Sequence, residues 1–295
     1  MKKFCSIIIM SLFTFSAFAQ EVVVEDTLVT GPNVSAHASS FTGIDGVYEK
    51  HHISQKKYIP YVHVREADVM WSKTIWRIID LREKMNLPLY YPTTRMEGRR
   101  SLVQVIYDAL ELGDVQAYDA TTNDSFERRL TKEEFRRALG AGVDSLYDEE
   151  GNVVITYSDA HLEQIQRLLL KEVWWFDRRY GRMDVRIIAV CPIRESTEGE
   201  GESERVKAEL CFWIYYPELR PYLSQQEVYN TRNDAQRSSY DDLMAQRHFA
   251  SYIYRESNVY NNRAIVEYAQ GLDANLEARR IHETIFNKEH DMWEY

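Results

Sequence analysis

The stretch that decides the fold is MDVRIIAVCPIRESTEGEGESERVKAELCFWIYYP, residues 183–217. Its two flanks are rich in β-branched and aromatic residues, which strands favour. Its acidic, glycine-containing centre, STEGEGESE, is typical of an exposed loop. The stretch therefore predicts an antiparallel hairpin, and VWWFDRR at residues 173–179 predicts a further strand just before it.

Helical patterns surround this hairpin. Residues 66–84 carry Trp71, Ile75, Ile78 and Ile79 at helical spacing, and residues 159–171 carry a similar stripe. Capping boxes predict where two other helices begin, and a glycine predicts where each of them ends. A cap is also expected at the start of a third helix. An apolar stripe indicates a further helix at the C-terminus. These features are Ser101 with Gln104 and Gly113, Thr131 with Glu134 and Gly140, Ser239 with Asp242, and the stripe Ala274, Ala278, Ile281 and Ile285.

Short extended pieces complete the pattern, at VQAYDA (115–120), NVVITYS (152–158) and LPLYYP (87–92). We therefore expect an α+β fold, with helices around a small antiparallel β-hairpin or meander and an extended N-terminal arm.

The N-terminus is typical of an exported protein. Lys2 and Lys3 precede a short apolar run and an Ala-Phe-Ala sequence, which is the layout of a secretory signal peptide. Cleavage between Ala19 and Gln20 is expected, and because no cysteine follows that position, a lipid anchor is not. We therefore divide the chain into a signal peptide (1–19), an extended arm of small and polar residues (20–57) and a single α+β domain (58–295).

Composition argues against nucleic acid as a partner. The formal net charge is −10, and loss of the signal peptide would make it more negative. The 25 arginines outnumber the 11 lysines, and there are 20 tyrosines. Arginine and tyrosine are enriched at protein interfaces, although tyrosine also fills ordinary cores. Paired arginines such as 178–179 are interpreted as solvated faces, some of which meet a partner's carboxylates.

The two cysteines outside the signal peptide are Cys191 and Cys211. A hairpin turning symmetrically about residues 200 and 201 would place them opposite each other, at a separation that a disulfide tolerates. The alternative is two small, buried, unpaired side chains, because a slip of one residue would break the register.

No cofactor, metal or catalytic set is expected. His51, His52 and His63 lie in or beside the arm, and the sequence HETIF at residues 282–286 lacks the second histidine of the zinc-protease motif. Two alternatives remain open, a periplasmic enzyme that uses Cys191 and a small-ligand-binding protein.

Several stretches taken together resemble one family. They are READVMWSKTIWRIIDLREKMNLPLYYP, MDVRIIAVCPI, LCFWIYYPE, SSYDDL, SYIYRESNVYNN and IFNKEHDMWEY, in this order between residues 58 and 295. The chain resembles the GldN/PorN family, periplasmic core components of the type IX secretion and gliding machinery.

The resemblance implies a non-enzymatic structural role in protein secretion and gliding. It implies a periplasmic ring built with an outer-membrane lipoprotein of the GldK/PorK kind, contact with the GldM/PorM motor protein, self-association within the ring, and peripheral association with the outer membrane. The predicted helices need only part of their aromatic residues for the buried stripe. We expect the others, Trp76, Tyr90 and Tyr91, at subunit interfaces. Thr27 in DTL and Ser145 in DSL resemble the short O-glycosylation sequon of bacteria that carry this machinery.

Overall fold

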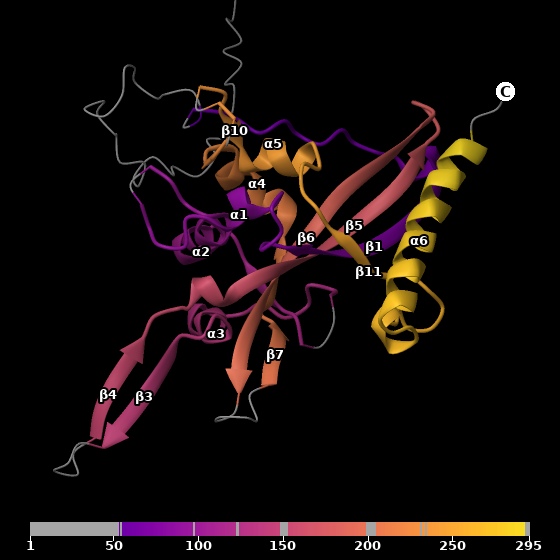
Figure 1. Ribbon diagram of the computed structural model, residues 1–295. Coiled ribbons are helices and arrows are strands. Elements are labelled where there is room, and N and C mark those ends of the chain that lie inside the picture. Colours follow the sequence, from indigo (N-terminus) through magenta and orange to yellow (C-terminus); the bar gives the residue numbers. More distant parts are fainter. Residues whose placement is uncertain are drawn as a thin grey trace, which may run out of the picture. The chain divides into compact units, whose positions relative to one another are not determined.

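A computed structural model describes residues 53, 55–96, 98–121, 124–147, 153–198, 205–230, 232–233 and 235–292. Within this part of the chain, seven strands form one sheet in which every pairing is antiparallel (Figure 1). The order is β11 (Tyr252–Glu256), β1 (Val69–Asp80), β5 (Ile165–Asp177), β6 (Arg182–Glu198), β8 (Phe212–Tyr215) and β2 (Ala117–Asp119), and β7 (Arg205–Leu210) also pairs with β6. The α+β class expected from the sequence is confirmed, with a sheet larger than a simple hairpin.

The hairpin predicted at residues 183–217 is the centre of this sheet. β6 pairs with β5 along most of its 17 residues, and its other edge pairs first with β8 and then with β7. The strand expected at 173–179 is the second half of β5, and the short strands expected near residues 117 and 155 are β2 and β4.

Two predicted helices are wrong. Residues 66–84 contain a 3-10 turn, Glu66–Asp68, followed by β1, and residues 159–171 contain a 3-10 turn, Leu162–Gln164, followed by β5. In β1, Ile75 and Ile79 point to one face of the sheet, and Trp76 and Ile78 point to the other. Both faces are covered, so apolar residues occupy both sets of alternate positions and only imitate helical spacing.

The capped helices form where they were expected. α2 (Leu102–Leu112) and α3 (Lys132–Ala138) begin with complete capping boxes, as does α5 (Tyr240–Ala245), and Gly113 ends α2 with a φ of 83°. The C-terminal stripe lies on α6 (Leu272–Asp291). The remaining helices are α1 (Leu87–Tyr90), α4 (Tyr216–Ser224) and a 3-10 turn, Ile265–Glu267. Residues 87–90 were expected to be extended, so that prediction is wrong.

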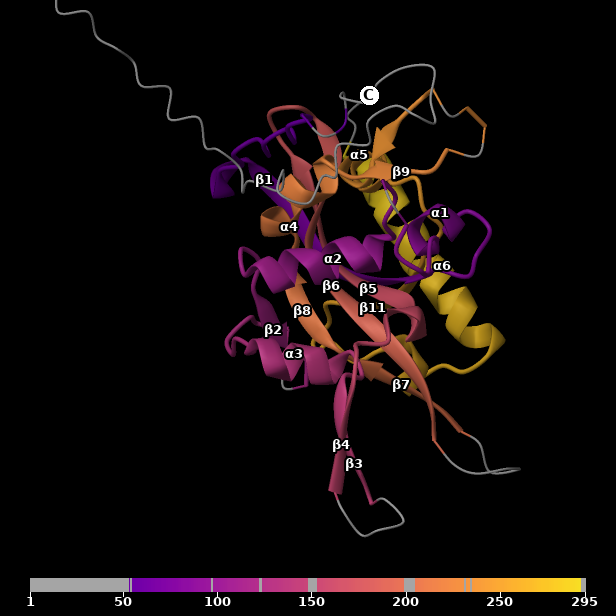
Figure 2. The ribbon, with the colours of Figure 1, turned by 90° about the vertical axis from the view of Figure 1, so that its left-hand side faces the viewer.

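Two small sheets lie outside the main one. β9 (Glu227–Val228) pairs with β10 (Ser238–Ser239), and β3 (Gly142–Tyr147) pairs with β4 (Val153–Ser158). The β3–β4 hairpin extends beyond α3 in both ribbon views (Figures 1 and 2).

Three apolar clusters hold these elements together. The largest packs α2, α3, α4 and α5 against one side of the sheet, through residues such as Ile79, Leu170 and Phe212. α6 packs on Ile75 and Ile253. A third cluster contains Trp76, Leu169, Cys191 and Trp213, and the segment 118–126 packs against it.

Candidate interaction surface

Residues 56–65, here called the strap, lead from the N-terminal arm into the sheet. The strap contains no helix or strand, and most of its side chains are exposed. It is nevertheless tied to the body at both ends and in the middle, chiefly by arginines from β6, α4 and the β5–β6 turn. Irregular surface segments held by a rigid scaffold are a common location for binding residues.

A buried ion pair lies under the middle of the strap. Arg220 of α4 donates two hydrogen bonds to the Asp241 carboxylate of α5, at 2.8 and 3.0 Å, and Tyr216 donates a third at 3.4 Å. Arg220 is 4% exposed and Asp241 is 6% exposed. Burial disfavours a charged arginine, but the hydrogen bonds to Asp241 and the charge of that carboxylate outweigh the cost and raise the pKa of Arg220.

Two tyrosines of the strap stack on the arginines beneath them. The Arg220 guanidinium lies 5.1 Å from the ring centre of Tyr58 and 4.1 Å from that of Tyr61. Arg186 of β6 lies 4.4 Å from the Tyr61 ring and donates to the Val62 carbonyl at 2.9 Å. Burial raises the pKa of Tyr61 further above physiological pH. These cation–π contacts replace the strand pairing that the strap lacks.

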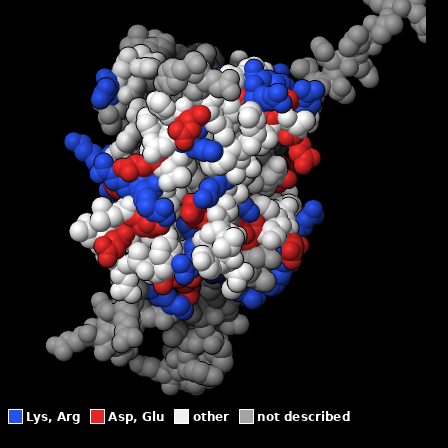
Figure 3. Space-filling view, turned by 90° about the vertical axis from the view of Figure 1, so that its right-hand side faces the viewer, with Lys and Arg blue, Asp and Glu red and all other residues white. Residues whose placement is uncertain are grey.

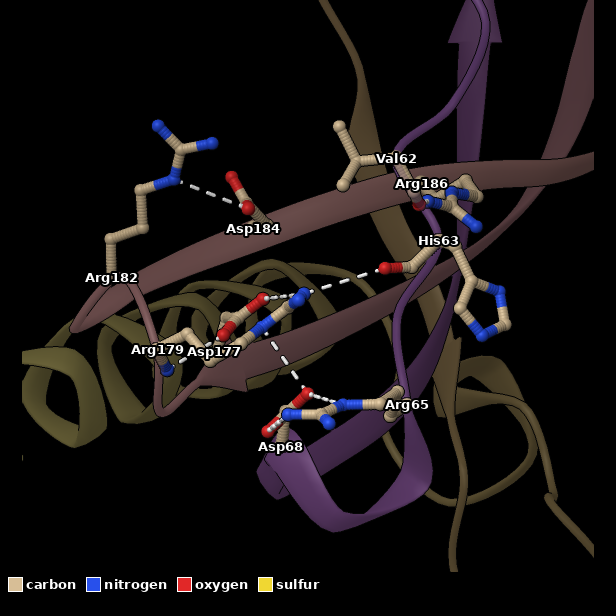
Figure 4. A network of polar contacts seen from close by, with 9 residues as sticks. All are labelled: Val62, His63, Arg65, Asp68, Asp177, Arg179, Arg182, Asp184 and Arg186. Atoms are coloured by element: carbon tan, nitrogen blue, oxygen red, sulfur yellow. Dashed lines mark hydrogen bonds and ion pairs between the residues drawn. The ribbon is translucent and has the colours of Figure 1, made fainter.

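The C-terminal end of the strap is fixed at the β5–β6 turn (Figure 4). Arg179 donates to the His63 carbonyl at 3.4 Å and forms ion pairs with Asp68 at 3.2 Å and Asp177 at 3.4 Å. The hydrogen bond from Arg65 is the main reason that the pKa of Asp68 is lowered. Of the arginine pair at 178–179, Arg179 therefore meets carboxylates of its own chain.

The N-terminal end of the strap is fixed at the start of α5. The Lys56 ammonium bonds the Asp242 carboxylate, and the Lys56 carbonyl accepts from the Ser224 hydroxyl at 3.3 Å. Burial would raise the pKa of Asp242, but the bonds from Lys56 and Ser239 outweigh it and lower that pKa. Asp242 is also the N3 residue of the α5 capping box, where it accepts from the backbone of Ser239, so one carboxylate joins the strap to a helix start.

The outer side of the strap carries two strongly exposed apolar side chains. Ile59 is 80% exposed and Val62 is 62% exposed, while Tyr61 is partly covered by the arginines below it. Exposed apolar groups on a fastened segment lose little entropy when a partner covers them, because the backbone is already fixed. The strap is therefore the candidate interaction surface.

The three aromatic residues expected at interfaces have different environments. Trp76 is 2% exposed, donates to the Asp124 carboxylate at 2.8 Å and lies under the guanidinium of Arg255, so its prediction as an interface residue is wrong. Tyr90 is half-buried and donates to the Glu163 carbonyl at 3.1 Å. Tyr91 is 52% exposed and stays an interface prediction.

The cysteines do not have the predicted register. Across the hairpin, Ile193 pairs with Leu210 and Val190 pairs with Ile214, so Cys211 falls at the break between β7 and β8 and is not opposite Cys191. Both are free and buried, so the structure contains no bridge between them. Burial raises the pKa of Cys191 well above its usual range and that of Cys211 to about 12. A nucleophilic cysteine needs an accessible, low-pKa thiol, so the environment of Cys191 is unsuited to catalysis.

The other predicted site residues are separate from the strap. Ser145 lies in β3 and pairs with Ile155. Ala19, Gln20, Thr27, His51 and His52 lie outside the described residues. Among the described residues, no group of three or more His, Cys, Asp or Glu side chains could hold a metal ion.

Sequence reasoning missed the residues that anchor the strap. The excess of arginine and tyrosine was interpreted as a sign of protein interfaces, whereas these arginines and tyrosines contact each other within the chain. Composition could not predict that Arg220 contacts Tyr61, because these residues are 159 positions apart and meet only after the sheet and α4 have formed.

Comparison with known proteins identifies the family. No described helix has the length and apolar character needed to cross a membrane, and no curated protein matches the chain. One family profile, that of gliding motility associated protein GldN, matches residues 64–294, from the end of the strap through α6. The resemblance found in the sequence is thus confirmed. The chain belongs to the GldN family of gliding motility associated proteins.

Proposed function

We propose that this chain is a non-catalytic structural subunit of the type IX secretion and gliding machinery. It is exported to the periplasm, loses residues 1–19, and assembles into a ring with an outer-membrane lipoprotein of the GldK/PorK kind. This lipoprotein holds it at the membrane, and the ring meets the GldM/PorM motor protein. Family membership over residues 64–294 is the observation that carries the proposal.

The strap supports an assembly role over an enzymatic one. It presents Ile59 and Val62 to solvent on a backbone that five anchoring side chains fix in place: Arg179, Arg186, Arg220, Asp242 and Ser224. Exposed apolar side chains on a fixed backbone suit contact with another protein. Cys191, the residue of the enzymatic alternative, is fully buried.

The test is co-purification from gently solubilised membranes, with sizing of the complexes. Ile59→Asp with Val62→Asp should reduce co-purification with the lipoprotein and should impair secretion and gliding. The melting temperature of the purified protein should stay unchanged, because both side chains are exposed. Val259→Asp is the matched control, since Val259 is 89% exposed on a different segment.

A second variant separates the arm from the strap. Deleting residues 21–52 removes most of the arm but keeps Lys56 and every strap anchor. We expect weaker association with the lipoprotein and an intact body, because arms of this composition gain order on binding. A full-length protein that is monomeric and absent from the membrane fraction would refute the ring-subunit proposal.

A further inference from the structure

α6 covers the body with only one of its faces. Ile281 and Ile285 are buried against Ile75, Ile253 and Ile265. Figure 1 shows the helix running along this side of the sheet, with its other face away from the strands.

The outward face of α6 also carries apolar side chains. Leu272, Leu276 and Phe286 are 73%, 55% and 63% exposed. At 3.6 residues per turn, positions 272, 276, 279, 283 and 286 lie within roughly 80° of one another, on the side opposite Ile281. Their spacing of four, three, four and three residues is that of a coiled-coil seam. The helix therefore has a second seam that no described residue covers.

A charged pair occupies the middle of this seam. The Nε atom of Arg279 lies 3.0 Å from the Oε1 atom of Glu283, and both side chains are largely exposed. Figure 3 shows this side of the molecule, where acidic and basic groups are interspersed with uncharged ones and neither sign dominates. A surface of this kind does not select a strongly charged partner.

We propose that this seam binds the same seam of a second copy of the chain, with the two α6 helices antiparallel. The two-fold axis passes on the seam side of the helix, at the level of residue 281 along its length. This register places Leu276 against Phe286 of the partner subunit and Arg279 against Glu283 of the partner subunit, twice each by symmetry. A parallel pair would instead place Arg279 against the partner's Arg279. The sequence of the seam is thus self-complementary in the antiparallel orientation only.

This contact goes beyond the proposed function and does not depend on it. A two-fold contact closes after two copies, so it cannot build a ring by itself. The two Leu276–Phe286 contacts, with Leu272 beyond them at the end of the seam, indicate a weak dimer, which the charge pair orients more than it strengthens.

Cysteine cross-linking tests the orientation. Leu276→Cys and Phe286→Cys are made separately in the mature chain, residues 20–295, and oxidised alone and as a mixture. The native Cys191 and Cys211 are buried and should not interfere. Cross-linked dimer should form mainly in the mixture. Cross-linking of each variant with itself, or none in the mixture, would overturn the proposal.

Charge reversal tests the register by sedimentation over a concentration series. Arg279→Glu and Glu283→Arg should each raise the dissociation constant about tenfold, because each brings like charges together twice. The double variant should restore wild-type association, since the pair is re-formed with its signs exchanged. Arg137→Glu, at an exposed position on α3, should change nothing. A wild-type protein that stays monomeric at every concentration, or a double variant no better than the single ones, would refute it. Normal co-purification with the lipoprotein in the Arg279→Glu variant would leave the proposed function intact, so the two failures are distinguishable.

Discussion

Replacing Arg220 with methionine should destabilise the protein and release the strap. The change keeps an unbranched side chain of similar length but removes the guanidinium. Asp241, which is 6% exposed, then loses two hydrogen bonds of 2.8 and 3.0 Å and is left in a buried site without its ion-pair partner. Removing one partner of a buried ion pair costs about 3–5 kcal/mol.

The cost should be measurable as a change in melting temperature. For a domain of this size, each kcal/mol corresponds to a shift of about 2–4 °C, so a decrease of roughly 6–20 °C is expected from that range. Arg137→Ala is the matched control, because its ion pair with Glu133 is exposed and spans 3.9 Å. That control should change the free energy of unfolding by less than about 0.5 kcal/mol.

The same substitution should also expose the strap to protease, because Tyr58 and Tyr61 lose the cation on which they stack. A double variant, Arg220→Met with Asp241→Leu, should recover part of the stability, since it leaves no unpaired buried charge. If Arg220→Met lowered the melting temperature no more than Arg137→Ala, the strap would not depend on this ion pair and the reasoning would be refuted.

Three other predictions concern two aromatic residues, the two cysteines and the carboxylate of Asp242. Trp76→Ala should cost about 3–5 kcal/mol in urea unfolding, whereas Tyr91→Ala, at an exposed side chain, should cost under about 1 kcal/mol and weaken co-purification with the lipoprotein. Iodoacetamide at pH 8 should label Cys191 and Cys211 only after denaturation, because burial raises both thiol pKa values; labelling of the native protein would contradict this. The pKa of Asp242 is lower folded than unfolded, so its ion pair with Lys56 stabilises the strap above about pH 4 and is lost as pH falls through the folded value. Relative to the intrinsic exchange rate at each pH, hydrogen exchange of residues 56–65 should therefore rise only when the pH falls through the folded pKa of Asp242.

Local features of the sequence were sufficient for the parts of the fold that local interactions specify. The helices beginning after Ser101 and Thr131 carry complete capping boxes, which satisfy their first backbone donors without help from the rest of the chain. The hairpin at 183–217 was also predictable, since its acidic centre cannot be buried and its flanks favour strands. The family was evident from several stretches in a fixed order, and the matched profile confirms it.

Tertiary structure decided β1 and β5. Leu168 and Leu170 face the cluster under the helices, and Leu169 faces the cluster that contains Trp76, so successive residues of β5 are all apolar. A strand buried on both faces loses the alternation that identifies strands in a sequence, and the remaining apolar run fits a helix equally well. Only neighbouring strands, which supply the backbone partners on both edges, select the extended form.

The strap and the role of Trp76 depended on tertiary structure for a related reason. Trp76 is buried because Asp124 and Arg255, from distant segments, satisfy its indole nitrogen and cover its ring. Likewise, the sequence determined that arginine and tyrosine are abundant, but only the packed sheet and α4 decided which arginine lies under which tyrosine. Cation–π and ion-pair contacts act over a few ångströms and leave no periodic pattern along the chain, so their partners are set by the fold alone.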